Sequence, residues 1–252
     1  MLSDQFLIEV ILERERVDSF ERYPFNLDAV RQLNRLELHR QVTFIIGENG
    51  SGKSTLLEAI AVAWGFNAEG GSRGFHFDTR ASHSSLYEYL RLSRGVGQPR
   101  DGYFLRAESF FNVATEIEKL DGEPGPAMKI GPAYGARALH EQSHGESFLA
   151  LLTERFHGRG FYILDEPEAA LSPSRQLSVL ARIHELARGG SQFIIATHSP
   201  IIMAYPEAVI YQLTEDGIEA VEYRDTEHFT VTRDFLNNTE KMLDILMSGG
   251  DQ

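Results

Sequence analysis

The residues with the clearest chemistry are glycines, a lysine and hydroxyl groups that follow a short apolar run. The run is Val42–Ile46, and the candidate binding residues after it are Gly47, Glu48, Asn49, Gly50, Ser51, Gly52, Lys53, Ser54 and Thr55. Glycine lets the backbone curl until successive N–H groups face one hollow, and a helix that begins there adds its positive dipole end. A triphosphate fits such a hollow, with Lys53 on the β- and γ-phosphates and the Ser54 hydroxyl as a ligand of Mg²⁺.

The spacing G-x-x-x-x-G-K-[ST] is that of a P-loop, which needs a strand before it and a helix after it. Apolar periodicity predicts that helix from Ser54 to about Trp64. The alternative is a glycine-rich turn with a surface lysine. The flanking strand and helix favour the phosphate site, with ATP as its ligand.

Two carboxylates follow a second apolar run. Phe161–Leu164 leads directly into Asp165 and Glu166, which indicates a buried strand with acids at its carboxyl end. In a doubly wound sheet the P-loop lies at that same edge. Asp165 is therefore a candidate Mg²⁺ ligand, through water, and Glu166 a catalytic candidate that polarises the attacking water. An exposed acidic turn is the alternative, but such a turn would not need the apolar run.

Two further segments carry candidate residues, one at the end of a predicted strand and one at the start of a predicted helix. The predicted strand Gln192–Thr197 ends at His198, which could hydrogen-bond a γ-phosphate or the catalytic water. A lone histidine there is more often structural, and its place in this series favours the functional role. Ser143 and Gly145 open a helix predicted to reach Phe156, and such a start presents N–H groups to an anion. Alone, this start is a weak signal.

The elements that position these residues predict an α/β fold with a central, mostly parallel sheet, an antiparallel β region and a helical subdomain. We expect a single domain over residues 1–252, with the helical subdomain inserted over about 66–158 and a helical tail over about 225–250. Other expected elements are a strand at Phe6–Leu12, a helix at Leu86–Leu92, a strand from Tyr103 to Ser109, a helix at Arg175–Arg188 and a hairpin from Val209 to Tyr223.

Two pairs of side chains allow both a functional and a structural interpretation. Tyr23 or Phe25 could stack on adenine, although ordinary packing against the sheet edge is the favoured alternative. His76 and His83 lie in a stretch rich in glycine and serine, without a carboxylate at metal-site spacing. We interpret both histidines as solvated loop residues.

Composition limits the classes of function. The 252 residues carry 37 Asp and Glu against 24 Lys and Arg, a net charge of −13, whereas proteins that coat nucleic acid normally have the opposite balance. The first residues lack the apolar core of a signal peptide, no stretch reaches membrane-spanning length, and the chain has no cysteine. The sequence therefore predicts a cytoplasmic enzyme, and its acidity speaks against DNA binding without excluding it.

The order of these motifs resembles the ABC-type ATPase superfamily from about residue 5 to 213, and more closely the small stand-alone bacterial ATPases labelled as an AAA family. In that resemblance Gly47–Ser54 corresponds to Walker A, Phe161–Glu166 to Walker B, and His198 to the switch histidine. Ser143–Glu146 is similar to the signature motif by which one protomer caps the ATP of the other. The resemblance implies a head-to-tail homodimer around ATP, with Lys53 and His198 acting in catalysis beside Glu166.

The sequence departs from that family pattern at three places. His144 stands where the first glycine of the signature is expected, while Ser143 and Gly145 remain. Glu108 stands near the position of the lid glutamine and becomes a further candidate metal ligand. Ser172 replaces the D-loop aspartate. These departures affect the expected rate and trigger of hydrolysis more than ATP binding.

The resemblance implies Mg²⁺-dependent ATP hydrolysis that drives a conformational change in a partner. One alternative is a detached nucleotide-binding subunit that pairs with a membrane permease. Another is an ATPase that acts on nucleic acid in repair or defence. A P-loop kinase is a third, and Ser143–Glu146 together with His198 argues against it, because a kinase has no use for a partner's signature helix.

Overall fold

The computed structural model describes residues 4–72, 84–107, 144–169 and 171–248, with the backbone alone at 144–146. The predicted strand end at Glu108 and Ser109, the histidines His76 and His83, and Ser143 lie outside these residues. None of the described helices is both long and apolar enough to cross a membrane.

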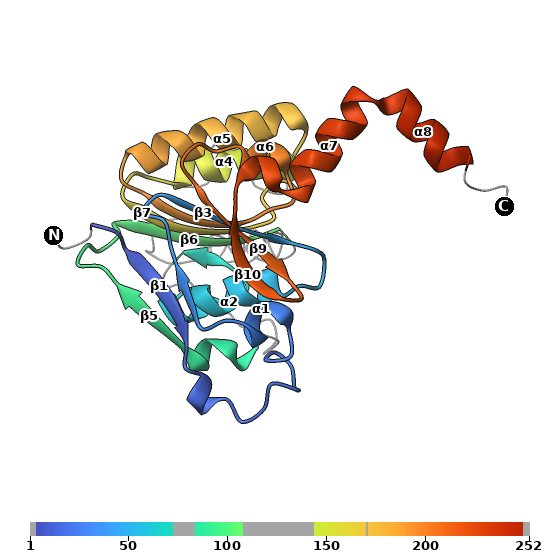
Figure 1. Cartoon of the computed structure of the whole chain (residues 1–252). Coiled ribbons are helices and arrows are strands. Elements are labelled where there is room, and N and C mark those ends of the chain that lie inside the picture. The colour runs from blue at the N-terminus through green and yellow to red at the C-terminus, as the bar shows by residue number, and fades with distance from the viewer. Residues whose placement is uncertain (1–3, 73–83, 108–143, 170, 249–252) are drawn as a thin grey trace, which may run out of the picture.

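A seven-stranded sheet forms the centre of the fold (Figure 1), in the order β10-β9-β3-β8-β7-β6-β4. Its strands are β3 (Val42–Gly47), β4 (Gly71–Ser72), β6 (Asp101–Arg106), β7 (Gly160–Asp165), β8 (Gln192–Ala196), β9 (Val209–Thr214) and β10 (Gly217–Val221). The five strands from β9 to β6 are parallel to their neighbours, and the edge strands β10 and β4 are antiparallel. The predicted parallel sheet and hairpin are both confirmed.

A second, antiparallel sheet has the order β2-β1-β5. Its strands are β1 (Leu7–Leu12), β2 (Arg35–Glu37) and β5 (Leu90–Arg94). The prediction of a helix at Leu86–Leu92 is wrong, because only a 3₁₀ turn at Ser85–Tyr89 precedes β5, whose backbone pairs with β1. The predicted helical insert is also wrong at its start, near residue 66, because β4, β5 and β6 belong to the two sheets.

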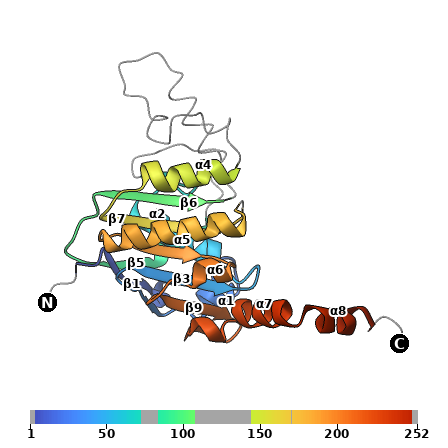
Figure 2. The ribbon, with the colours of Figure 1, turned by 90° about the horizontal axis from the view of Figure 1, so that it is seen from above.

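Helices cover the central sheet in layers, as the two ribbon views show (Figure 2). The α-helices within the described residues are α1 (Asp28–Arg31), α2 (Lys53–Trp64), α4 (His144–Ala150), α5 (Pro173–Arg188), α6 (Pro200–Met203), α7 (Glu227–Asn237) and α8 (Thr239–Ser248). A π-helical turn over Leu151–Arg155 continues α4, and short 3₁₀ turns lie at Arg14–Arg16 and Tyr223–Asp225. The last two helices, α7 and α8, lie within the stretch predicted as a helical tail and project away from the body.

The alternation of side chains in the parallel strands explains why both faces of the sheet are covered. Phe44, Tyr162 and Phe193 pack with the apolar side of α5 on one face. Their neighbours in sequence, Ile45, Ile163 and Ile194, pack with α2 and the antiparallel sheet on the other. A sheet apolar on both faces must lie between two layers, so the carboxyl edge of its strands is where polar side chains gather.

Gln192, the first residue of β8, ties the two sheets together. Its buried amide accepts hydrogen bonds from the N–H groups of Phe6 (3.1 Å) and Leu7 (2.9 Å), and donates to the carbonyls of Leu7 (2.8 Å) and His39 (3.0 Å). One side chain therefore pairs backbone groups of two chain segments, Phe6–Leu7 and His39.

Replacing Gln192 with leucine is expected to lower the free energy of unfolding by about 3 kcal/mol or more, since each buried backbone group left without a partner costs about 1–3 kcal/mol. Urea denaturation followed by circular dichroism measures the change. Gln41→Leu is the matched control: Gln41 donates one hydrogen bond to the Ala187 carbonyl from a partly exposed position, and should cost under about 1 kcal/mol. Equal losses in the two variants would contradict this account of Gln192.

Candidate nucleotide site at the carboxyl edge of the sheet

The carboxyl ends of β3, β8 and β7 bring three of the predicted segments to one edge of the sheet. The strands are adjacent and parallel, with Ala196 paired to Ile45 on one side and to Asp165 on the other. Gly47 ends β3, Glu166 follows β7, and His198 follows β8 by two residues. This convergence is what the sequence predicted from buried runs that each end in a polar group.

The loop from Gly47 to Gly52 holds a backbone that needs glycine at defined points. Gly50 and Gly52 lie in the left-handed region, with φ of 86° and 95°. At Gly47 the φ is 151°, and an added Cβ would stand 2.8 Å from the carbonyl oxygen of Leu213 on the neighbouring strand. A side chain at Gly47 would therefore push β9 away from β3.

Lys53 is folded back into the loop. Its Nζ donates hydrogen bonds of 2.8 Å to the carbonyl oxygens of both Gly47 and Glu48, and the side chain is buried. Burial lowers the pKa of Lys53, while the nearby carboxylates of Glu166 and Asp165 act in the opposite direction. The structure thus holds an ammonium group at the mouth of the loop, next to the N-terminus of α2, where a phosphate would meet both.

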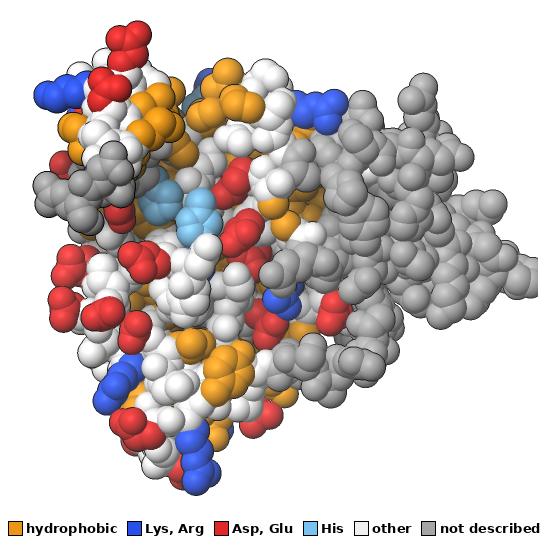
Figure 3. Space-filling model, turned by 90° about the vertical axis from the view of Figure 1, so that its right-hand side faces the viewer, with side chains coloured by type: hydrophobic (Ala, Val, Ile, Leu, Met, Phe, Trp, Pro, Cys, Tyr) orange, Lys and Arg blue, Asp and Glu red, His pale blue; other side chains and the backbone are white. Residues whose placement is uncertain are grey.

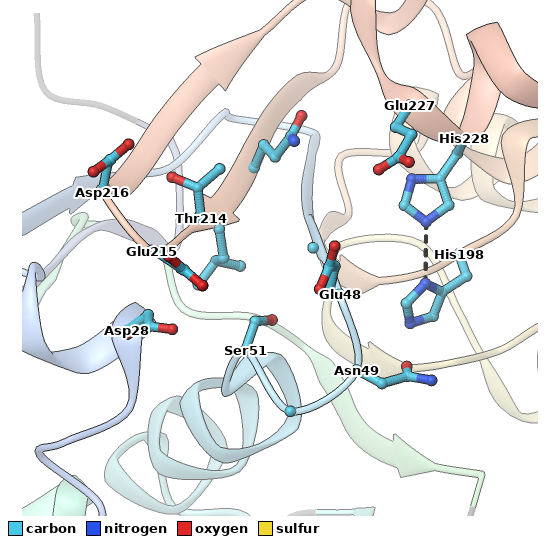
Figure 4. A pocket seen from close by; sticks show the side chains of 14 residues that line it. Asp28, Glu48, Asn49, Ser51, His198, Thr214, Glu215, Asp216, Glu227 and His228 are labelled. Carbon is cyan, nitrogen blue, oxygen red and sulfur yellow. Dashed lines mark hydrogen bonds between the residues drawn. The ribbon is translucent and has the colours of Figure 1, made fainter.

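Beside the loop lies a hollow of about 910 Å³, open to solvent. It is lined by Glu48, Asn49 and Ser51 of the loop, by His198, and by the turn between β9 and β10, as the close view shows (Figure 4). Asp28, Glu215, Asp216 and Glu227 add acidic groups to its wall. In the space-filling view of this face, histidine side chains lie among acidic ones (Figure 3).

Ser54 and Asp165 form the candidate metal pair. The Ser54 hydroxyl donates a 3.1 Å hydrogen bond to Oδ1 of Asp165, whose carboxylate is buried. A hydroxyl and a carboxylate are hard oxygen donors of the kind that Mg²⁺ takes, with water completing its shell. The two residues therefore fit the ion. Among the residues that the structure describes, no group of three or more His, Cys, Asp and Glu side chains is arranged as a metal site of its own.

Arg106 is a neighbour of this pair that the sequence reasoning missed. Its Nη1 donates a 2.6 Å hydrogen bond to Glu58 of α2, and its Nε lies 4.0 Å from Oδ2 of Asp165. The signal was available, because β6 pairs in parallel with β7 and sets Arg106 opposite Asp165. A charged residue that ends a buried strand is expected at the carboxyl edge of the sheet, beside the acid that ends the neighbouring parallel strand.

Glu166 stands in a strained backbone conformation. Its φ is 52°, the left-handed region that side chains other than glycine rarely adopt, and its N–H donates to the carbonyl of Ala196 at 3.0 Å. Its Oε1 lies 3.7 Å from Nε2 of His198, and the side chain is partly open to solvent. The twist turns this carboxylate out of the strand line toward His198 instead of into the core.

His198 is fixed by two further residues that the sequence analysis did not identify. Its backbone N–H donates to the half-buried carboxylate of Glu168, at 2.5 Å, and its Nδ1 lies 3.1 Å from Nε2 of His228. Burial lowers the pKa of His198, and the charge of Lys53 adds to that effect. Burial raises the pKa of Glu168. No motif marks His228, which lies thirty residues further along the chain.

The remaining sequence candidates divide into three groups. Thr55 lies in the first turn of α2, and Gly145 in the first turn of α4. Ser143 and Glu108 lie outside the described residues, so their predicted roles stay predictions. Phe25 is buried, with its ring 4.8 Å from that of Tyr89, which agrees with the packing alternative, whereas Tyr23 is 63% exposed.

A parallel sheet with a glycine loop at the carboxyl end of β3, the acid pair Asp165 and Glu166 at the end of β7 and a histidine after β8 defines a P-loop domain of ABC type. A solved structure of MJ1267, an ATP-binding cassette of an ABC transporter, has a TM-score of 0.50 to this fold, with 16% identity over 85% of this chain and 90% of that chain. That similarity shows the fold alone.

Family models match most of the chain. The model of the "AAA domain" matches residues 22–121, and that of the "AAA domain, putative AbiEii toxin, Type IV TA system" matches residues 72–204. The chain therefore belongs to this AAA-domain family, within the ABC-type ATPase superfamily.

Curated relatives carry ABC names. The putative ABC transporter ATP-binding protein TTE0246 of Caldanaerobacter subterraneus is 29% identical over 72% of this chain and 80% of its own length. The cell division ATP-binding protein FtsE of Bacillus subtilis is 21% identical over 81% of this chain and 93% of its own. With ABC transporter G family member STR2 of Medicago truncatula, 28% identical, the match covers 63% of this chain and 24% of that protein. The chain thus spans about a quarter of the STR2 relatives it matches.

Proposed function

We propose that this ABC-type ATPase hydrolyses ATP in the cytoplasm with Mg²⁺, and that it dimerises head-to-tail around ATP to drive a conformational change in a partner. The observation that carries the proposal is the meeting of Lys53, the Ser54–Asp165 pair, Glu166 and His198 at one sheet edge. Each of these groups has a separate use in phosphoryl transfer to water.

The roles follow from position and chemistry. Lys53 and the loop N–H groups bind the β- and γ-phosphates, and Ser54 and Asp165 would hold Mg²⁺, which would neutralise part of the charge that develops on them. Glu166 orients a water for attack and accepts its proton, as the new P–O bond forms and the bond from the γ-phosphorus to the β,γ-bridging oxygen breaks. His198 donates from Nε2 to a γ-phosphate oxygen.

The dimer supplies what one protomer lacks. The resemblance assigns Ser143 and Gly145 to the ATP of the opposite protomer, where N–H and hydroxyl groups at the start of α4 would face its γ-phosphate. Similarity to relatives named as ABC transporter ATP-binding proteins, such as TTE0246, favours a membrane permease as the partner that the ATPase cycle drives. The alternative partner is nucleic acid. The net charge of −13 favours a protein partner over it.

The proposal is tested by light-scattering mass together with phosphate release. We expect the wild type to release phosphate from ATP with Mg²⁺, and Glu166→Gln to double its mass when ATP and Mg²⁺ are added. Adding Lys53→Ala to Glu166→Gln should abolish that change. A wild type that neither hydrolyses ATP nor changes mass with any nucleotide would overturn the proposal, whereas hydrolysis by a monomer would overturn the dimer alone.

A further inference from the structure

The start of α7 brings the side chain of His228 into contact with His198 in the nucleotide site. Nε2 of His228, the second residue of α7, lies 3.1 Å from Nδ1 of His198, and the dashed line in Figure 4 marks this contact. The two rings are tilted by 47°, with centroids 5.3 Å apart, so they meet through their nitrogens and are not stacked. His228 and Glu227 also line the hollow beside the P-loop.

Several contacts hold His228 in place. The Thr226 hydroxyl accepts the N–H of Phe229 and caps α7, while the Tyr223 hydroxyl donates a 2.8 Å hydrogen bond to the carbonyl of Pro200. Tyr223 and Phe229 also bring their rings together, with centroids 4.8 Å apart. Because Pro200 comes two residues after His198, these contacts fix the start of α7 relative to the segment that carries His198.

The other nitrogens of the pair define what the contact can do. Nε2 of His198 and Nδ1 of His228 are both buried and, among the residues the structure describes, neither has a hydrogen-bond partner. Oε1 of Glu166 lies 3.7 Å from Nε2 of His198, which is beyond hydrogen-bond range. His198 therefore keeps Nε2 available for a group that enters the site.

The direction of the histidine–histidine bond decides which proton His198 presents. In a neutral imidazole one nitrogen donates and the other accepts, and the hydrogen bond at one nitrogen sets the role of the other. If His228 donates, Nδ1 of His198 accepts and Nε2 of His198 carries the proton. If Nδ1 of His198 donates instead, Nε2 of His198 has no proton. Its lone pair would then repel a phosphate oxygen.

Burial of both rings favours neutral imidazoles. Burial lowers the pKa of His198, with Lys53 acting in the same direction and Glu166 against it. Burial also lowers the pKa of His228, with His198 and Lys53 in the same direction and Glu227 and Glu168 against it. When both rings are neutral, a single proton lies between the two contacting nitrogens. Either histidine can therefore be the donor at neutral pH.

We propose that His228 is a positioning residue that donates from Nε2 to Nδ1 of His198 and so holds His198 in the tautomer whose Nε2–H faces the γ-phosphate. His228 acts through His198 and touches no reacting atom. The inference goes one step beyond the proposed hydrolysis and uses it for one of its two tests. It also links the position of α7 to ATP hydrolysis. Any displacement of that helix would break the hydrogen bond from His228, and the tautomer of His198 would no longer be fixed.

The first test reads the tautomer in nucleotide-free protein and needs no activity. Nitrogen chemical shifts of ¹⁵N-histidine-labelled full-length protein, with His198 assigned by its loss in His198→Gln, distinguish Nε2–H from Nδ1–H. We expect Nε2–H in the wild type and Nδ1–H in His228→Glu near pH 9, because an ionised carboxylate can only accept. An Nδ1–H tautomer of His198 in the wild type would overturn the inference.

The second test compares two variants of nearly equal size at position 228. Glutamine can still donate to Nδ1 of His198, so His228→Gln should keep ATP turnover within about 5-fold of wild type, whereas loss of one donor to a developing charge costs about 100-fold or more. His228→Glu should show that loss near pH 9. Toward pH 7 its turnover should recover, because the new carboxylate raises the pKa of His198 and the imidazolium carries Nε2–H again. The wild type should not show this rise.

Two controls separate this role from charge and from packing. The double variant Glu227→Gln with His228→Glu restores the wild-type charge at the start of α7 and should keep the same dependence on pH. His184→Gln changes an exposed histidine of α5 and should leave turnover unchanged. Identical pH profiles for His228→Gln and His228→Glu would overturn the inference. If the wild type does not hydrolyse ATP, the proposed function fails, and the tautomer measurement still decides the role of His228.

Discussion

Glu166→Gln lowers the rate of ATP hydrolysis by about 10²–10⁴-fold, the usual share of a general base, while ATP affinity stays within about 3-fold of wild type. Glutamine has the same shape but cannot accept a proton from water. The side chain of Glu166 is 40% exposed and lies beside His198, so the substitution leaves no buried group without a partner. Phosphate release under saturating ATP and Mg²⁺, together with equilibrium nucleotide binding, separates the two effects.

The backbone at Glu166 sharpens this prediction. Its φ of 52° is a costly conformation for glutamate and for glutamine alike, so the exchange should leave the backbone strain unchanged. The unfolding midpoint of Glu166→Gln is then expected close to that of wild type. Glu185→Gln, an exposed site on α5, is the matched control and should not change turnover. Turnover of Glu166→Gln within about 3-fold of wild type would assign the base to another residue.

The sequence was sufficient for the parts of the site that local pattern defines. Buried runs that end in Gly47, Asp165 and His198 predict the carboxyl edge of a parallel sheet, because apolar residues on both faces of a strand require two covering layers. The P-loop spacing then places Lys53 next to the phosphate position. These features depend on neighbours in sequence or on one rule of sheet geometry.

The parts that could not be predicted depend on side chains far apart in the chain. Arg106 reaches Asp165 through the pairing of β6 with β7, and His228 meets His198 because a hairpin and a 3₁₀ turn return the chain to the site. Leu86–Leu92 was misassigned for the same reason: β5 forms because β1 offers it a partner. In that segment the tertiary pairing outweighed the local helical preference.

Lys53→Ala is expected to weaken ATP binding by about 100-fold or more. A hydrogen bond to a charged group contributes about 1.5–3 kcal/mol, and 1.4 kcal/mol corresponds to a tenfold change in affinity. The wall of the hollow makes this loss larger. Glu48, Asp28 and Glu227 line it, so without the ammonium group of Lys53 a triphosphate would meet an acidic surface.

Lys53 also holds the loop itself, which requires a control on the fold. Its Nζ joins the carbonyls of Gly47 and Glu48, and alanine leaves both without this partner. Titration with a fluorescent ATP analogue measures affinity, and thermal unfolding without nucleotide measures the loop's own contribution. Lys241→Ala on α8, far along the projecting tail, should change neither. If Lys53→Ala bound ATP within about 5-fold of wild type, the hollow would hold the triphosphate by its backbone N–H groups alone, and Lys53 would serve to shape the loop.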